Sequence, residues 1–325
     1  MILLLAFSLS LMLCLLLASR HTPIKILDLP NERSLHKTPT PHTGGIGIIS
    51  AIFIAWAVYA LIYAMPDVMG WIAVSALLVA GISFIDDYRE LSPLIRLSVH
   101  ALSAVVLLAG GLVMFDGWIG TLLTWFTIVW MLNLYNFMDG MDGFAGGMTL
   151  SGFGFLAAAG WMQGASEYTI STLLVAAAAL GFLCVNFPPA RIFMGDVGSA
   201  TLGLLAAAFS LWGIQSGLFS LWYPLIVFSP FVVDATVTLI RRLLNRERIW
   251  EAHRSHYYQR LVQLGWSHKK TVLAEYVIML LTGGSALVVL QINSVVATVA
   301  ILVGWSCIYL IIAILVHRLE LDVIE

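Results

Sequence analysis

The sequence is poor in charged residues. Aspartate, glutamate, lysine and arginine make up 10% of its 325 residues, hydrophobic residues make up 60%, and the mean hydropathy is +0.95. A soluble globular domain carries about 25% charged residues, so these values exclude that class. Because about 20 consecutive apolar residues cross a bilayer as a helix, the composition indicates a membrane protein with many spans.

Cysteine is also scarce. Cys14, Cys184 and Cys307 lie inside apolar runs and share no paired spacing, which argues against a disulfide framework and against a zinc site. The apolar N-terminal segment has no basic residue before Arg20, whereas a secretory signal needs a positive charge ahead of its apolar core. We therefore expect residues 2–19 to form a retained first helix.

Long apolar runs predict eleven membrane-spanning segments. They cover about residues 2–19, 44–64, 69–85, 96–115, 118–137, 144–163, 169–187, 199–214, 219–240, 272–291 and 294–316. In hydrocarbon the backbone must satisfy its own hydrogen bonds, so each segment is expected to be α-helical. The predicted fold is all-α, with residues 1–325 as a single transmembrane domain.

The basic residues support this arrangement. All 16 lysines and arginines fall after an odd-numbered span, and the connections after even-numbered spans have none. The positive-inside rule then places the N-terminus outside, the C-terminus inside and the long polar loops in the cytoplasm. Residues 241–271 form the largest of these loops.

Carboxylates gather in the same loops. Asp86 and Asp87 end the third span, and neighbours on a helix point about 100° apart, so we expect them to have different roles. A second group of polar residues has intervals of three, namely Asn133, Asn136, Asp139 and Asp142. On a helix this spacing spreads the side chains over half of the circumference, so they do not form one stripe. Asp196 lies between Gly195 and Gly198, which allow close backbone approach.

Any one of these carboxylates could be a solvated helix end, whereas five of them on one face favour a site. Oxygen-rich clusters suit a hard cation such as Mg²⁺. A divalent cation beside basic residues and a glycine-rich turn is suited to phosphate esters. The sequence therefore predicts phosphoryl transfer at a membrane surface.

Two histidines in the last cytoplasmic loop are further candidates. His253 and His256 are spaced i, i+3 with Arg254 between them. A metal pair would need a third ligand nearby, so contacts with phosphate oxygens or sugar hydroxyls are the favoured interpretation. Asp234, an acid in an apolar helix, is either functional or packed against a polar neighbour.

Five motifs in order resemble one family, the polyprenyl-phosphate N-acetylhexosamine-1-phosphate transferases of glycosyltransferase family 4. They are NERSLHKTPTPHTGG, DDYRELSP, NLYNFMDGMDG, NFPPARIFMGDVGS and AHRSHYYQRL, and the resemblance covers nearly the whole chain. The last motif is similar to the subgroup that primes O-antigen synthesis on undecaprenyl phosphate with UDP-linked N-acetylated sugars.

The resemblance implies roles for particular residues. Those implied to be catalytic are Asp86, Asp87, His253, Arg254 and His256. Those implied to bind the nucleotide or substrate are Asn136, Asp139, Asp142, Asn186, Phe193 and Lys37. Asp196 is implied to bind Mg²⁺, for which Mn²⁺ could substitute. Asp86 is implied to act on the lipid phosphate; because a phosphate monoester is already mostly a dianion at neutral pH, we favour Asp86 as a positioning group or a second metal ligand, with proton abstraction as the alternative.

Three features depart from the family pattern. Glu90 stands where the phospho-MurNAc-pentapeptide translocase branch has lysine, and HRSH stands where that branch has three histidines. Both departures argue against a MurNAc-pentapeptide substrate. His42 stands where close relatives often have arginine, which leaves its phosphate-binding role open.

The resemblance implies that undecaprenyl phosphate attacks the β-phosphorus of a UDP-N-acetylhexosamine and releases UMP. The implied setting is a bacterial inner membrane, with a periplasmic N-terminus, a cytoplasmic C-terminus and a cytoplasmic active site. A homodimer is compatible with this expectation and a nucleic-acid partner is not expected. The alternative is a transporter of a phosphorylated or nucleotide-linked solute, although its polar groups should collect near the midplane.

Overall fold

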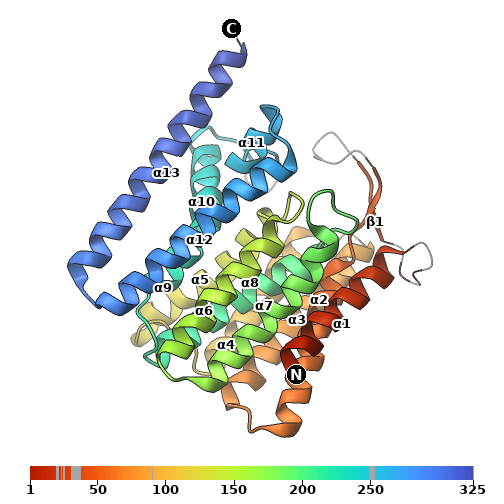
Figure 1. Ribbon diagram of the computed structural model, residues 1–325, viewed down its shortest axis with the longest axis vertical. Helices are drawn as coiled ribbons and strands as arrows, with labels where there is room; N and C mark the ends of the chain where they lie inside the picture. The colour runs from red at the N-terminus through yellow and green to blue at the C-terminus, as the bar shows by residue number, and fades with distance from the viewer. Residues whose placement is uncertain are drawn as a thin grey trace.

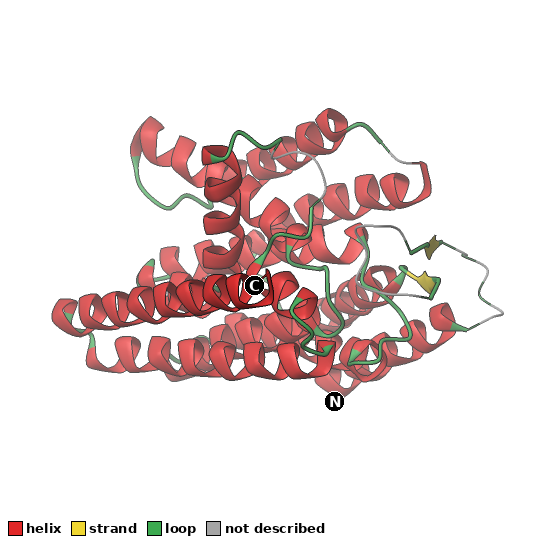
Figure 2. Cartoon of the chain, turned by 90° about the horizontal axis from the view of Figure 1, so that it is seen from above, coloured by secondary structure: helices red, strands yellow, loops and turns green. Residues whose placement is uncertain are grey.

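The computed structural model describes residues 1–19, 22, 24, 26–30, 38–89, 91–248 and 253–324. These residues are mostly helical, which confirms the all-α class. The helices are α1 (Ile2–Ala18), α2 (Gly44–Ile62), α3 (Asp67–Arg89), α4 (Pro93–Ala109), α5 (Gly117–Phe137), α6 (Phe144–Met162), α7 (Ser166–Asn186), α8 (Asp196–Gln215), α9 (Trp222–Val227), α10 (Ser229–Leu244), α11 (Tyr257–Gln263), α12 (His268–Ile292) and α13 (Val295–Ile324). Two short antiparallel strands, β1 (Leu27–Asp28) and β2 (Thr40–Pro41), lie at one edge (Figures 1 and 2).

All of the described helices except α10 and α11 begin within four residues of the start of a predicted span. Among the described residues, seven helices are long and apolar enough to cross a membrane, namely α2, α3, α5, α7, α8, α12 and α13. The apolar helices α1 and α4 have 17 residues each, which is at the lower limit for a span. The protein therefore spans the membrane many times, and the number of eleven crossings stays a prediction.

The predicted span 219–240 is wrong as a single helix. It is divided at Phe228 into α9 and α10, and Pro230 stands at the start of α10. Proline lacks an amide donor and its ring clashes with the preceding turn, so a continuous helix is interrupted there. The Ser229 hydroxyl satisfies one freed group by donating to the carbonyl of Ile226 at 2.8 Å.

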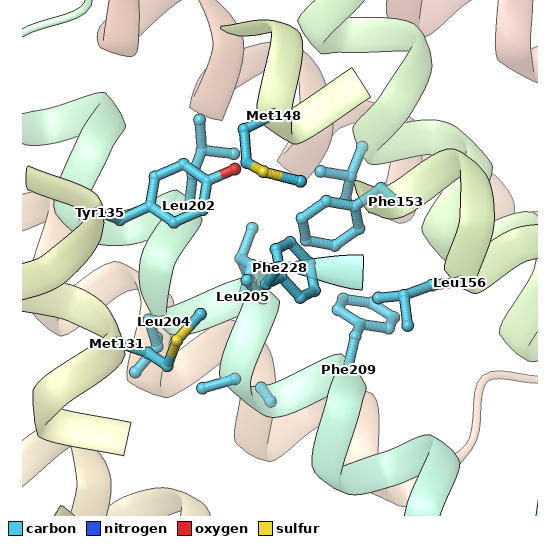
Figure 3. Packing of buried hydrophobic residues seen from close by; sticks show 14 of the residues in the cluster. Met131, Tyr135, Met148, Phe153, Leu156, Leu202, Leu204, Leu205, Phe209 and Phe228 are labelled. Atoms are coloured by element: carbon cyan, nitrogen blue, oxygen red, sulfur yellow. The ribbon is translucent and has the colours of Figure 1, made fainter. Parts of the chain in front are cut away.

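Helix α8 forms the centre of the bundle. In its spanning window 83% of the residues are buried, compared with 6% for α13. Around α8 the aromatic rings of Phe153, Phe209 and Phe228 lie close together (Figure 3), and Phe153 packs edge to face against the other two, with centroids 5.7 Å from Phe209 and 6.5 Å from Phe228. Helix α13 instead runs along the edge of the molecule (Figure 1) and exposes most of its apolar side chains.

Exposed tryptophans distinguish the two ends of the bundle. Trp71 and Trp118 lie near the starts of α3 and α5, and Trp161 lies at the end of α6. Tryptophan is enriched at membrane–water interfaces. Because Asp87 and Asn136 lie at the opposite ends of α3 and α5, the polar cluster belongs to the other face of the membrane.

Candidate active site

The end of α3 meets the start of α8. Asp86 and Asp87 lie in the last turn of α3, and Asp196 is the first residue of α8. Gly195 permits this approach, because its φ is +73° and a Cβ there would lie 2.3 Å from the carbonyl oxygen of His42 and 3.2 Å from Oδ2 of Asp87. Glycine adopts this backbone conformation without a steric penalty. The start of α8 therefore touches both α3 and the segment before α2.

Arg96, in the first turn of α4, joins two of these acids. Its Nη1 donates to Oδ2 of Asp86 at 2.8 Å and to Oδ2 of Asp196 at 3.2 Å. Asp86 also accepts a hydrogen bond from the backbone amide of Leu91 at 2.6 Å and is largely buried. Two carboxylate oxygens from different helices thus converge on one point that suits a positive charge.

Asp87 has a different set of partners, as its position on α3 predicts. Its carboxylate accepts from the backbone amides of Asp196 at 3.4 Å and Val197 at 3.5 Å. Those amides are among the unpaired donors at the N-terminus of α8, where a negative charge is favourable. Asp87 therefore fixes the start of α8, while Asp86 faces Arg96.

The loop after α5 adds polar groups to this cluster. The side chain of Asn136 is within hydrogen-bonding reach of the Asp196 carboxylate. Burial raises the pKa of Asp139 well above its usual value, and the carboxylates of Asp196 and Asp87 raise it further, although the backbone amide of Gly195 opposes this. The cluster has more carboxyl groups than cations, which favours either a proton on Asp139 or a bound cation.

Asp142 and Asn186 hold the loop between α7 and α8 in place. Oδ2 of Asp142 accepts from the backbone amide of Ala190 at 3.0 Å and lies 3.4 Å from Nδ1 of His268. Asn186 is buried; it accepts from the amide of Gly143 and donates to a backbone carbonyl, both at 2.8 Å. Both side chains therefore brace the loop, and their predicted contacts with a nucleotide stay predictions.

Phe193 belongs to the same loop. Its amide donates to the carbonyl of Pro41 at 2.7 Å, and its carbonyl accepts from the amide of Gly44 at 2.9 Å. These bonds attach the loop to the start of α2, beside His42. The ring is partly exposed, and its stacking on uracil stays a prediction.

The histidine motif is positioned by Asp234 of α10. The Asp234 carboxylate contacts Nδ1 of His256 at 3.2 Å and accepts from the amides of Tyr257 at 3.0 Å and Tyr258 at 3.3 Å. These amides open α11, so Asp234 both caps α11 and orients the His256 ring. The Tyr258 hydroxyl then reaches the carbonyl of Phe137 at 3.4 Å, which brings α11 to the end of α5. Of the two interpretations of Asp234, the structure shows the packing against polar neighbours.

His253 lies beside His256, with ring centroids 4.9 Å apart. Burial lowers the pKa of His253 to about 4, and the positive charges of His256, Arg242 and Arg241 act in the same direction. His253 is therefore neutral at pH 7 and can donate or accept a hydrogen bond, but it does not supply charge. Arg254 is exposed and supplies the positive charge of this motif.

Sequence reasoning missed Arg96 as a site residue and counted it only for topology. A signal was present, because a cation in the first turn of a helix opposes the helix dipole and needs a nearby anion. His42 was considered, and burial lowers its pKa, so a charged phosphate contact there is not supported. Lys37 and Glu90 lie outside the described residues.

The donor set fits a magnesium ion. Arg96 Nη1 marks a point at which two carboxylate oxygens already converge, and oxygen donors are what Mg²⁺ prefers. Among the described residues no three His, Cys, Asp or Glu side chains lie close enough to hold a metal by themselves. Mg²⁺ is commonly held by one or two carboxylates with water and substrate phosphates, so Asp86 and Asp196 suffice.

Comparison with known proteins identifies relatives over most of the chain. The pattern of glycosyl transferase family 4 matches residues 68–214, from α3 to α8. A probable undecaprenyl-phosphate N-acetylglucosaminyl 1-phosphate transferase of Bacillus subtilis is 33% identical over 301 residues, which cover 87% of this chain and 84% of that protein.

Two further relatives have related names. A decaprenyl-phosphate N-acetylglucosaminephosphotransferase of Mycobacterium tuberculosis (strain H37Rv) is 33% identical, over 80% of this chain and 74% of that protein. A phospho-N-acetylmuramoyl-pentapeptide-transferase of Chloroherpeton thalassium is 29% identical, over 83% and 85%. These names do not support the transporter hypothesis. The chain belongs to glycosyl transferase family 4 and is a membrane-embedded glycosyl-1-phosphate transferase.

Proposed function

We propose that the protein transfers the sugar 1-phosphate of a UDP-N-acetylhexosamine to undecaprenyl phosphate. The observation that carries this proposal is the convergence of Asp86 and Asp196 on one cationic point at the ends of three helices. Such a point suits the negatively charged diphosphate of a sugar nucleotide. The names of the relatives from B. subtilis and M. tuberculosis support a polyprenyl phosphate acceptor.

In this reaction an oxygen of the lipid phosphate forms a bond to the β-phosphorus of the sugar nucleotide. The bond from that phosphorus to the α-phosphate oxygen breaks, and UMP leaves with the electron pair. A phosphate monoester has a second pKa near 6 and is mostly a dianion at neutral pH. Asp86 therefore need not remove a proton, and we assign it to holding the metal, whose position Arg96 occupies when no metal is bound.

The remaining residues bind and orient the substrates. When bound at Asp196 and Asp86, Mg²⁺, or Mn²⁺ in its place, supplies positive charge to the diphosphate. Arg254 contacts phosphate oxygens, and neutral His253 hydrogen-bonds to the phosphate or the sugar. Asn136 and Asp139 lie on the nucleotide side of the cluster.

The departures from the pentapeptide-transferase pattern reduce the number of sugar donors that we expect. Glu90 and the HRSH sequence favour N-acetylfucosamine, N-acetylquinovosamine or N-acetylglucosamine over MurNAc-pentapeptide. The reaction is then the first membrane step of O-antigen or another cell-envelope polysaccharide. We place it at the cytoplasmic face of the bacterial inner membrane, with the N-terminus periplasmic.

Release of UMP from purified protein tests this function. With undecaprenyl phosphate and Mg²⁺, we expect UMP with at least one of the three UDP-N-acetylated sugars and none with UDP-MurNAc-pentapeptide. Asp196→Asn is expected to lower the rate by about 100-fold or more. Asp67→Asn, at the opposite end of α3 from Asp86, is the matched control and should leave the rate unchanged. UMP release that does not require lipid phosphate would contradict the proposal.

A further inference from the structure

A cavity of about 330 Å³ lies among α10, α12 and α13. Most of its lining is apolar, but Asp234, Glu275 and Tyr309 also face it. The volume lies at the lower end of the range for small-molecule sites. Among the described residues that line it there are two acids and no lysine, arginine or histidine. Arg241 and Arg260 stack on the Tyr257 ring, with each guanidinium carbon 5.8 and 4.8 Å from the ring centroid, and neither is a lining residue.

Glu275 is the unusual member of this lining. It is the only charged residue between Thr271 and Ile292 of α12. Among the described residues, no hydrogen bond or ion pair engages its carboxyl group. Charged residues inside membrane spans are costly and mark functional sites by default.

The neighbouring polar groups are already occupied. Both oxygens of Asp234 accept hydrogen bonds, from Thr238, His256 and the start of α11. The Tyr309 hydroxyl is paired with Ser229 at 2.8 Å. Glu275 therefore remains as an acceptor for a group that enters from outside.

The cavity opens toward lipid. Two lining residues on different helices, Val237 of α10 and Leu310 of α13, are 40% and 61% exposed. Glu275 follows the start of α12 at His268 by seven residues, or about 10 Å of helix. That depth is close to the headgroup region at the face that carries the acidic site.

We propose that this cavity binds the primary ammonium headgroup of a bilayer lipid, with Glu275 as its hydrogen-bond and charge partner. A carboxylate pairs with an ammonium through short charge-assisted hydrogen bonds, and the apolar wall covers the adjoining chain. An anionic headgroup would meet two acidic groups and, among the described lining residues, no cation, so the phosphate of the polyprenyl acceptor does not fit here.

The occupied cavity would reinforce the candidate active site. Asp234 of α10 and Tyr257 both line the cavity. Tyr257 is the first residue of α11, and Asp234 accepts its amide hydrogen and orients His256. A ligand on Glu275 compensates the negative charge that faces Asp234 across the cavity. The lipid binding itself does not depend on the proposed sugar transfer.

Native mass spectrometry of the full-length protein tests this site. After removal of co-purified lipid, the protein is mixed with phosphatidylethanolamine, phosphatidylcholine and phosphatidylglycerol of identical acyl chains. We expect phosphatidylethanolamine to be retained roughly tenfold better than phosphatidylglycerol. Free ethanolamine in excess should not displace it, because the apolar wall favours a lipid; displacement at low concentration would overturn a lipid as the occupant.

Variants test whether the lipid preference arises at this cavity. Glu275→Gln should remove the preference, and Ala313→Phe, which fills the cavity and keeps the carboxyl group, should remove it as well. Glu167→Gln, an exposed acid at the start of α7, should keep it. Equal retention of the three lipids by the wild type, or a preference that survives in Glu275→Gln or Ala313→Phe, would overturn the proposal.

Discussion

At the scale of single residues, the adjacent carboxylates of Asp86 and Asp87 have different partners and therefore different roles. Asp86 contacts the Arg96 guanidinium, whereas Asp87 accepts from the amides that open α8. Helix geometry alone predicted that the two would differ. It could not identify their partners, because Arg96 and Asp196 come from other helices.

Arg96 occupies the point at which a metal would bind, so it should compete with divalent cations. Arg96→Gln is expected to tighten Mn²⁺ binding by about tenfold, because a positive charge leaves the neighbourhood of Asp86 and Asp196. Electron paramagnetic resonance of free Mn²⁺ measures this directly. Arg96→Lys keeps the charge and should stay close to wild type; unchanged affinity in Arg96→Gln would show that the guanidinium lies off the metal position.

His253 gives a pH dependence of stability. Its pKa is about 4 in the folded protein and about 6.5 when exposed, so the unfolded chain binds the proton more tightly. Its contribution is therefore present above pH 6.5 and is lost as pH falls toward 4. The midpoint of thermal unfolding should fall less steeply over this window in His253→Gln than in wild type. The exposed His317→Gln is the control, and parallel curves for wild type and His253→Gln would contradict the assignment.

At the scale of elements, the glycine before α8 is the most sensitive junction. Gly195 and Gly217 both have positive φ, but only Gly195 has backbone and carboxylate atoms where a Cβ would point. Gly217→Ala should cost about 1 kcal/mol from backbone strain alone. Gly195→Ala should cost several kcal/mol and should displace Asp196, with loss of activity. Thermal unfolding and UMP release measure both effects, and equal costs for the two variants would rule out the steric explanation.

Helix positions could be predicted from apolar runs, because spans need about 20 apolar residues regardless of their neighbours. The break at Phe228 was missed although Pro230 marks it, since the surrounding run is long enough for one span. Helix α11 was missed because seven residues in a polar loop give no periodic signal, and Asp234 of another helix caps it. The bracing roles of Asp142 and Asn186 depend on loop contacts that no local pattern encodes.

At the scale of the whole molecule, the two ends of the helix bundle carry different types of side chain. One end carries exposed tryptophans and the other carries the carboxylate cluster. The mostly exposed face of α13 is available to lipid or to a second copy, and the expected homodimer stays a prediction.

Orientation can be measured with single cysteines introduced into a protein in which Cys14, Cys184 and Cys307 are replaced by serine. Ser166, before the body of α7, and Ser92, before α4, are both exposed and lie on opposite predicted sides. In intact cells a membrane-impermeant maleimide should label Ser166→Cys and should label Ser92→Cys only after the membrane is opened. The reverse pattern would place the active site outside.

The proposed reaction is an attack of the lipid phosphate on the β-phosphorus of the sugar nucleotide. Its most direct test is to supply UDP-N-acetylhexosamine labelled with ³²P at the β-position, with undecaprenyl phosphate and Mg²⁺. We expect the label to move to the lipid extract in equal amount to the UMP released, and we expect Asp196→Asn to lower both by about 100-fold or more. Label that remains in water-soluble UDP while the sugar moves to the lipid would contradict it.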